Sequence, residues 1–257
     1  MANSVSLSLF LGITEALLLG LRLAFIPTLL DVLRNPLVIF RLSQTFMTHL
    51  WAGFSDGVDQ NSRPMKEGPI STHSHGVVLD LGAVTRYIAL EPNVRMHDKI
   101  RQAANASGFQ EEDRSLVILG CGAEDLTTIS DATTGGVDTL ISVLTVCSIP
   151  DPKRLLTRLV ENILKPGGNY IFYEHVRSPR DDVARWQKFY TPVWGVFFDG
   201  CRLNQPTDKW VEDMKTVDEK GKEVSMWSEG RCSIDPTANQ VSLVWHVVGR
   251  FVKKATI

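Results

Sequence analysis

The stretch that decides the fold is VVLDLGAVTRYIALEPN, residues 77–93, which contains two short apolar runs. The first run, Val77–Leu81, ends at Gly82, and the second, Tyr87–Leu90, ends at Glu91. Apolar runs of this length, bounded by Gly or Pro, are typical of buried β-strands. In a doubly wound α/β sheet, a glycine after the first strand and an acid after the second face a bound ligand. The stretch therefore predicts the ligand-binding edge of such a sheet.

The spacing between the two runs is too short for an ordinary domain of this kind. A crossover between parallel strands needs roughly a dozen residues or more, usually including a helix. Here only residues 82–86 separate the runs, and no second glycine follows Gly82 within the stretch. Two explanations stay open at this point. The strands form a tight hairpin, or an α/β domain has lost an internal segment just after Ala83.

Composition and charge limit the possible partners. The chain has 257 residues, of which 44% are hydrophobic and 22% charged, enough for one domain with an appendage or at most two domains. Its net charge of −2 gives no electrostatic reason to expect nucleic acid. No CxxC pair occurs, so we predict no disulfide framework, no metal site and a reducing environment, with Cys147 in the core. The four cysteines are Cys121, Cys147, Cys201 and Cys232.

The N-terminal segment Val5–Leu30 is apolar, interrupted only by Glu15 and Arg22. It is long enough to span the hydrocarbon core of a bilayer, about 30 Å, and it lacks the features of a cleaved secretory signal. Further basic residues, Arg34 and Arg41, follow it, which places the next domain in the cytosol by the positive-inside tendency. We predict a membrane anchor, spanning or interfacial. The alternative is a helix buried against the domain.

The rest of the chain alternates between strand and helix patterns. Asp151 and Pro152 suit the start of a helix with an apolar stripe, and Lys165–Gly168 suits its end. Alternating strands and helices predict a parallel sheet with helices on its faces. The predicted strands are 77–81, 87–90, 115–119, 137–143 and 169–173, and a further helix covers 94–107. The predicted regions are an apolar helical anchor (1–55), a linker (56–76) and an α/β domain (77–257).

Several short motifs occur in a fixed order along this domain. They are LDLGA (79–83), LEP (90–92), GAEDL (122–126), VCSIPDPKRLL (146–156), LKPGGNYIFYEHV (164–176) and DGCRL (199–203), with Thr207 and Trp210 soon after. The ordered set resembles the class I methyltransferases that use S-adenosylmethionine. Within that class it is similar to the membrane-associated methyltransferase-like proteins that methylate small alkyl thiols.

The resemblance implies a Rossmann-like sheet with helices on both faces, completed by an antiparallel hairpin of strands 223–227 and 241–252. Family members carry a glycine-rich loop and a helix between LDLGA and the second strand, and this chain lacks them. The resemblance therefore favours an internal deletion over a hairpin fold, with the first crossover helix missing. It also implies attachment to the endoplasmic reticulum or to lipid droplets.

The resemblance further implies a set of cofactor-binding residues. Asp80 and Gly82 would border the methionine part of S-adenosylmethionine, and Glu91 would hold the ribose. Ala123 and Glu124 would face the adenine, and Leu144 and Thr145 would line the site after the fourth strand. The alternatives are strand-end packing for Asp80 and Gly82 and a surface carboxylate for Glu91.

Methyl transfer depends mainly on positioning and desolvation, with a base where the nucleophile loses a proton. The candidate catalytic residues are His175, at the end of a strand, and Asp199, in DGC. The alternatives are a hydrogen-bonded core histidine and a turn. An aromatic segment follows the fifth strand and predicts an apolar substrate lid, a membrane-facing surface or ordinary core. Its members are Trp186, Phe189, Tyr190, Trp194, Phe197 and Phe198.

Together these patterns predict a methyltransferase that acts on a small, apolar acceptor, with thiol sulfur favoured by the resemblance. Two other hypotheses stay open. The short connection between the first two strands leaves a non-catalytic, membrane-anchored remnant of the fold, which affinity for S-adenosylmethionine separates from the enzyme. The aromatic segment leaves a protein that binds hydrophobic ligands, which would bind lipid without methyl transfer.

Overall fold

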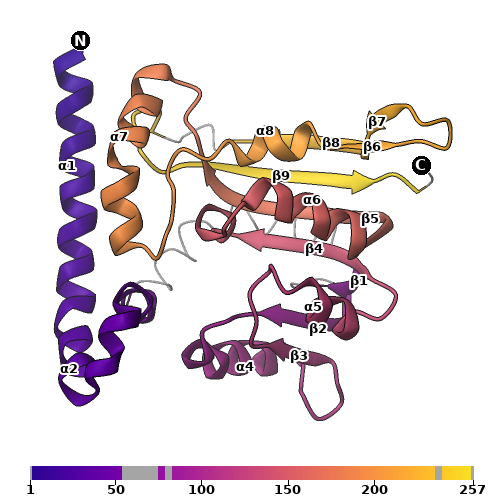
Figure 1. Ribbon diagram of the computed structural model, residues 1–257, viewed down its shortest axis with the longest axis horizontal. Helices are drawn as coiled ribbons and strands as arrows, with labels where there is room; N and C mark the ends of the chain where they lie inside the picture. Colours follow the sequence, from indigo (N-terminus) through magenta and orange to yellow (C-terminus); the bar gives the residue numbers. More distant parts are fainter. Residues whose placement is uncertain (1, 54–74, 79–82, 235–238, 256–257) are drawn as a thin grey trace.

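The predicted parallel sheet is confirmed in a computed structural model, which describes residues 2–53, 75–78, 83–234 and 239–255. Seven strands follow the order β3-β2-β1-β4-β5-β9-β8 (Figure 1). Neighbouring strands from β3 to β5 are parallel, whereas β9 is antiparallel to both β5 and β8. The strands are β1 (His75–Val78), β2 (Ala83–Leu90), β3 (Leu116–Leu119), β4 (Val137–Val143), β5 (Leu164–Val176), β8 (Trp227–Ser233) and β9 (Trp245–Lys253).

Helices cover both faces of this sheet. The larger core lies on one face, where Leu140 and Phe172 pack with residues of α5, α6 and α8. On the other face, Val84 packs with Ile141 and Ile171, and also with the cluster that α4 covers. The helices are α4 (His97–Ala106), α5 (Leu126–Ala132), α6 (Pro152–Asn162), α7 (Asp181–Phe197) and α8 (Thr207–Glu212), with short 3₁₀ turns η3 (Val94–Met96) and η4 (Val146–Ser148).

The strands β1 and β2 pair directly and in parallel, with Val78 opposite Tyr87. Parallel pairing excludes the hairpin alternative. The predicted start of the second strand was wrong by four residues, because the β-branched Val84 and Thr85 extend β2 back to Ala83. All four residues between β1 and β2, 79–82, fall outside the described residues, so the missing crossover helix and the loss of a segment stay predictions.

The helix α6 differs in detail from its predicted ends. Asp151 precedes it with φ of 45°, but the Asp151 side chain makes no capping hydrogen bond. The helix ends at Asn162, and the motif LKPGG begins β5 instead of stopping the helix. The end of α6 is closed by Lys253 of β9, whose ammonium donates to the carbonyls of Val160, Glu161 and Leu164 at 2.7–2.9 Å.

The C-terminal hairpin joins the sheet through a different strand from the one predicted. β8 (Trp227–Ser233), not the stretch 223–227, pairs with β9. Residues Glu223–Ser225 form β7, which pairs with β6 (Lys215–Val217) in a separate two-stranded sheet. β9 begins at Trp245, four residues after the predicted Val241.

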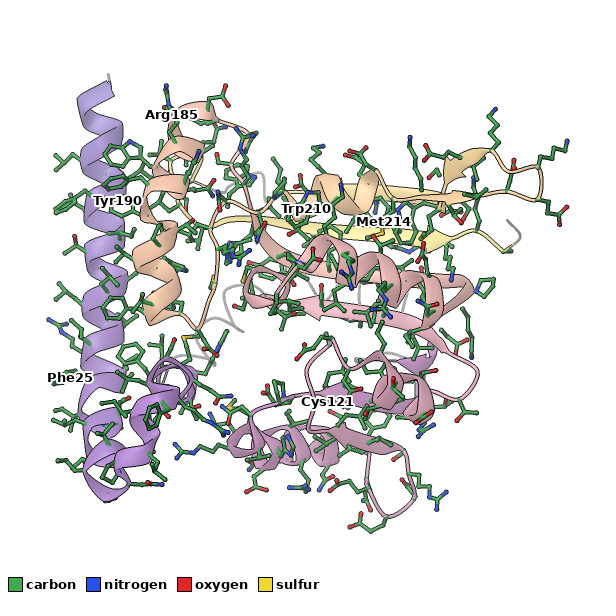
Figure 2. All side chains as sticks on the ribbon, in the orientation of Figure 1. Phe25, Cys121, Arg185, Tyr190, Trp210 and Met214 are labelled. Carbon is green, nitrogen blue, oxygen red and sulfur yellow. The ribbon has the colours of Figure 1, made fainter. Side chains whose placement is uncertain are left out.

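The N-terminal region forms a long helical arm beside α7 (Figure 1). It consists of α1 (Ala2–Gly20), the π-helical turn η1 (Leu21–Phe25), α2 (Ile26–Arg34), the 3₁₀ turn η2 (Pro36–Arg41) and a helix over residues 42–53. Leu9 and Ile13 of α1 are buried against Val183 of α7 and Leu203. Figure 2 places Tyr190 between the two helices.

Most large apolar side chains on this arm face away from the domain. Phe10, Phe25 and Leu33 are 54%, 53% and 70% exposed. The segment Leu7–Arg34 is long and apolar enough to cross a membrane, with a mean hydropathy of 2.0. The arm therefore packs on the domain along one side but is not buried as the alternative expected, because most of its large apolar side chains are exposed. The membrane anchor stays a prediction.

The helix α7 is fixed to the sheet by one buried amide. The Gln187 side chain accepts a hydrogen bond from the Ser178 backbone N–H at 2.8 Å. It donates to the carbonyls of Val176 and Leu243 at 3.0 and 2.8 Å. Gln187 is fully buried, so these bonds form away from water. They tie α7 to the end of β5 and to the segment before β9.

Candidate functional site

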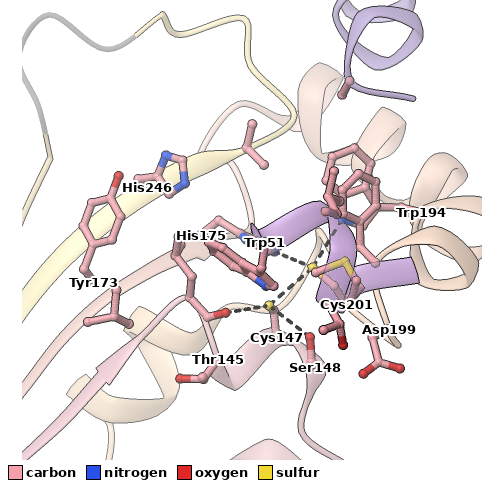
Figure 3. Close-up of a pocket in the computed structure, with 18 of the residues that line it drawn as sticks. Trp51, Thr145, Cys147, Ser148, Tyr173, His175, Trp194, Asp199, Cys201 and His246 are labelled. Carbon is pink, nitrogen blue, oxygen red and sulfur yellow. Dashed lines mark hydrogen bonds between the residues drawn. The ribbon is translucent and has the colours of Figure 1, made fainter. Parts of the chain in front are cut away.

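A cavity of about 850 Å³ lies at the carboxyl ends of β2, β4 and β5. This edge is where ligands bind in open α/β sheets, and the volume suits a small-molecule site. Ala16 and Leu19 of α1 and Trp51 of the helix 42–53 form part of its wall, so the N-terminal arm helps to build it. Figure 3 shows Trp51 beside residues that come from the ends of the strands.

One part of the cavity is formed by the end of β2. Glu91 lines it, and one Glu91 carboxylate oxygen accepts a hydrogen bond from the Asn93 backbone N–H at 2.7 Å. Burial raises the pKa of the Glu91 carboxyl above its usual value. The Glu91 carbonyl is bound by the His97 ring at 2.7 Å. The carboxylate is thus held at the cavity wall by local contacts.

The turn after β4 is held by hydrogen bonds to a buried carboxylate. Glu174 is fully buried, and its Oε1 accepts hydrogen bonds from the backbone N–H groups of Thr145 and Val146 at 3.1 and 3.3 Å. Leu144, which lines the cavity, has φ of 53°. This conformation is unfavourable for leucine, and such strain collects at functional sites. Thr145 also lines the cavity, so Glu174 fixes the shape of this wall.

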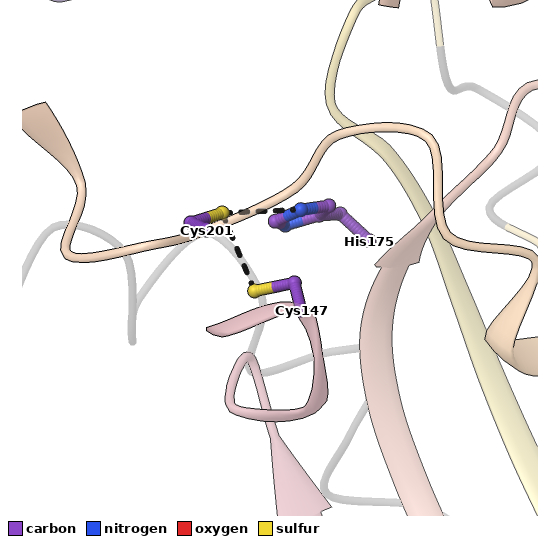
Figure 4. A group of neighbouring side chains, drawn as sticks. All are labelled: Cys147, His175 and Cys201. Atoms are coloured by element: carbon purple, nitrogen blue, oxygen red, sulfur yellow. Dashed lines mark hydrogen bonds between the residues drawn. The ribbon is translucent and has the colours of Figure 1, made fainter. Parts of the chain in front are cut away.

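Two thiols and an imidazole meet at the wall next to this turn (Figure 4). Cys201 Sγ lies 3.3 Å from Cys147 Sγ and 3.4 Å from His175 Nε2. All three residues are buried and line the cavity. The contact with Cys201 and burial raise the pKa of the Cys147 thiol well above its ordinary value. The His175 Nε2 atom also lies 3.3 Å from the Arg202 carbonyl oxygen.

Aromatic rings complete the cavity. Trp194 and Phe198 stack with their ring centres 3.9 Å apart, and the Trp194 indole N–H donates to Cys201 Sγ at 3.3 Å. On another side, Tyr173 and His246 stack at 5.0 Å. Burial lowers the pKa of His246 to about 4, so this ring is neutral at physiological pH. The wall around the thiols is therefore largely apolar.

Comparison with known proteins agrees with this architecture. No family model matches the chain. An O-methyltransferase family protein from Burkholderia thailandensis superposes with a TM-score of 0.50 over 81% of this chain and 60% of its own, at 12% identity. The fold is that of the class I methyltransferases.

Curated relatives of this methyltransferase fold are similar in sequence as well. The chain is 30% identical over 129 residues to human thiol S-methyltransferase TMT1B, covering 50% of each. It is 29% identical over 128 residues to human thiol S-methyltransferase TMT1A, covering 49% of this chain and 50% of the relative. The chain thus spans about half the length of the curated relatives it matches.

The methyltransferase fold brings together five of the nine predicted site residues. Glu91, Leu144, Thr145, His175 and Asp199 all line the cavity, and Asp199 is exposed at its rim with φ of 46°.

The structure leaves the other four predicted site residues outside this group. Ala123 packs against the main core and Glu124 is exposed, so neither lines the cavity, because their turn follows β3 near the far edge of the sheet. Asp80 and Gly82 lie outside the described residues.

The aromatic segment divides among the roles expected for it. Trp194 and Phe198 line the cavity. Trp186 and Tyr190 pack with the cluster on α1, and Phe197 packs with the helix 42–53. Phe189 is 68% exposed.

Sequence reasoning missed Cys147, Cys201 and Glu174 as parts of the site. Cys147 is buried as predicted, but it also lines the cavity. Cys147 and Cys201 are 54 residues apart, so no spacing pattern links them. The available signal was their position in two motifs. VCS follows the end of strand β4, and DGC follows the end of helix α7.

Proposed function

We propose that this protein transfers a methyl group from S-adenosylmethionine to a small apolar thiol. The observation that carries the proposal is the cavity at the carboxyl ends of β2, β4 and β5, which has a carboxylate on one side and an apolar wall on another. The similarity to proteins named thiol S-methyltransferases supports sulfur as the acceptor. The relatives match about half of this chain, and the proposal applies their activity to the whole protein.

The cavity fits S-adenosylmethionine in volume and in the residues at its β2 side. Glu91 would bind the ribose hydroxyls through its carboxylate, whose position is fixed by the Asn93 N–H. Leu144 and Thr145 would hold the cofactor against the end of β4. When bound, the cofactor supplies a methyl group on a positively charged sulfur, which a nucleophile attacks in line. Asp80 and Gly82 remain proposed contacts to its methionine part.

The apolar wall would bind the acceptor and exclude water from it. Trp51, Trp194 and Phe198 provide flat apolar surfaces suited to an alkyl chain. Removing water from a thiolate increases its reactivity, and holding it in line with the methyl group accounts for most of the rate. His175 and Asp199 line the cavity, and either residue would receive the thiol proton.

The N-terminal arm would attach the protein to a membrane. Its exposed apolar face, which includes Phe10, Phe25 and Leu33, suits a lipid environment. Because Ala16 and Leu19 of the same arm line the cavity, an apolar acceptor dissolved in lipid would reach the site directly. A cytosolic orientation at the endoplasmic reticulum or lipid droplets agrees with the basic residues after α1.

The test uses the full chain purified in detergent. Calorimetry measures S-adenosylmethionine binding, and mass spectrometry measures methylation of an alkyl thiol. Glu91→Gln should weaken cofactor binding about 10–100-fold, the effect of losing hydrogen bonds to a charged group worth about 1.5–3 kcal/mol. The exposed Glu112→Gln is the matched control and should bind as the parent does.

Absence of cofactor binding at millimolar concentration, in a chain shown to be folded, would overturn the proposal. That result would favour the non-catalytic remnant, for which the four-residue connection between β1 and β2 is the supporting observation. Binding of alkyl ligands without methyl transfer would favour the hydrophobic-ligand protein.

A further inference from the structure

Three soft metal-binding side chains converge on one point of the cavity wall (Figure 4). Cys147 lies in η4 just after β4, His175 lies at the end of β5, and Cys201 lies in the loop after α7. One ligand atom from each residue lies within 4.8 Å of the other two. Two of the three positions are set by strand ends in the middle of the sheet, so the arrangement rests on rigid elements.

Two of the three ligand separations are close to those of a tetrahedral zinc site. With Zn–S bonds of about 2.3 Å and Zn–N bonds of about 2.0 Å, tetrahedral angles place two sulfurs about 3.8 Å apart and a sulfur and nitrogen about 3.5 Å apart. The observed separations are 3.3 Å between the sulfurs and 3.4 Å between Cys201 Sγ and His175 Nε2. An outward movement of a few tenths of an ångström would admit the ion.

The surroundings favour a metal-bound thiolate at Cys201. Its sulfur has one proton to donate but contacts both Cys147 Sγ and His175 Nε2, and it also accepts the Trp194 indole N–H. Donation to a ligating sulfur is the outer-shell contact that tunes metal sites. The contact between His175 Nε2 and the Arg202 carbonyl is 3.3 Å, long enough to be exchanged for a metal bond.

We propose that Cys147, His175 and Cys201 bind a zinc ion whose fourth coordination position opens into the cavity. Two thiolates and one imidazole suit zinc, and a three-residue set of this composition leaves one position for water or substrate. Within the described part of the chain, no fourth His, Cys, Asp or Glu joins the group. All three side chains line the cavity, so the open position faces the ligand.

A role for this position rests on the proposed function. An acceptor thiol would lose its proton to Asp199 or to solvent, and zinc held by the three side chains would stabilise the resulting thiolate in the cavity. The thiolate sulfur would form a bond to the methyl carbon as the bond from that carbon to the cofactor sulfonium breaks, which leaves the methyl thioether and S-adenosylhomocysteine. Binding of the ion itself displaces the protons of Cys147 and Cys201. His175 would then act as a ligand and not as the base, which leaves Asp199 as the residue at the rim that receives the acceptor proton.

The experiment measures metal content of the full chain, purified in detergent with a reductant and reconstituted with zinc. We expect inductively coupled plasma mass spectrometry to find one zinc ion per chain. Cys147→Ser and Cys201→Ser should each lose it, whereas Cys121→Ser and Cys232→Ser, which alter the two cysteines outside the cluster, should keep it. Circular dichroism shows that each variant is folded.

Reconstitution with cobalt in place of zinc gives an absorption spectrum of the site and needs no variant. Thiolate-to-cobalt charge-transfer bands should appear, and their pattern should change when an alkyl thiol is added. A reduced, folded wild-type chain that takes up no zinc would overturn the proposal, as would zinc retained equally in all four variants. Zinc binding without methyl transfer would leave the site standing and refute the proposed function instead.

Discussion

The two faces of the central sheet differ sharply in how they are covered. On one face, Leu140 of β4 and Phe172 of β5 join a large core built with α5, α6 and α8. On the other face, their chain neighbours Ile141 and Ile171 form a small cluster with Val84 and Val143. Among the described residues this second cluster contains strand residues alone. A crossover helix between β1 and β2 would pack on this face.

The difference shows where the fold tolerates change. The strands β4, β5 and β9 pack with α6 in the large core of the first face. Glu174 and His175 lie in β5, and Cys147 lies in η4 just after β4. The predicted loss of a segment falls between β1 and β2, near the proposed cofactor contacts. Under the proposed function, such a loss would alter the cofactor side of the cavity and leave the wall formed at β4 and β5 in place.

The largest expected effect compares two adjacent residues that point to opposite faces. Leu140 and Ile141 are 5% and 7% exposed and have the same number of carbon atoms. We expect Leu140→Ala to cost about 3–5 kcal/mol of unfolding free energy, and Ile141→Ala about 2 kcal/mol, because fewer of the described side chains pack against Ile141. Urea unfolding measures both. Equal costs would show that the second face is as well packed as the first.

A smaller effect tests the contact between Lys253 of β9 and the end of α6, on the first face. Lys253→Met removes the ammonium that donates to three carbonyls at the end of α6. Leaving these carbonyls without a partner should cost about 2–3 kcal/mol. Lys254→Met is the matched control, because Lys254 bonds to Met226 through its backbone N–H, which the substitution keeps. A cost shared by both variants would refute this role for Lys253.

The smallest effect concerns the site on the β2 side. Because burial raises the pKa of Glu91, the folded chain holds this proton more tightly than the unfolded chain. Between the ordinary carboxyl pKa and the raised one, stability therefore falls as pH rises. Glu91→Gln should remove this fall and be slightly more stable at neutral pH, while losing cofactor affinity. If the unfolding free energies of wild type and variant changed with pH by the same amount from pH 4 to 7, this expectation would be contradicted.

Much of the fold followed from local sequence patterns. The apolar run at 137–143 matches β4, and the stripe after Pro152 matches α6, because burial on one face imposes a regular spacing. The motif LKPGG was less informative, since its proline and glycines suit a strand start as well as a helix stop. The partner of β9 was missed because residues 223–233 contain two short strands with similar patterns.

The site was only partly predictable. Glu91, Leu144 and Thr145 follow strand ends, and His175 is the last residue but one of β5. Ligands bind at the carboxyl ends of the strands in α/β sheets, and this rule brings such residues together. The pairing of Cys147 with Cys201 depends on how the loop after α7 returns to β4, which no local pattern encodes. The contribution of Trp51 depends on the N-terminal arm folding back over the domain.

The buried Gln187 amide has a consequence for how ligands are chosen. Its three hydrogen bonds hold α7, and with it Trp194, against the sheet before anything binds. An outward movement of α7 would break all three hydrogen bonds where no water replaces them, so we expect this wall to stay in place when a ligand binds. Under the proposed function, discrimination among acceptors would come from how well each one fills a preformed cavity, and a rigid acceptor of matching width would lose less entropy on binding than a long flexible one.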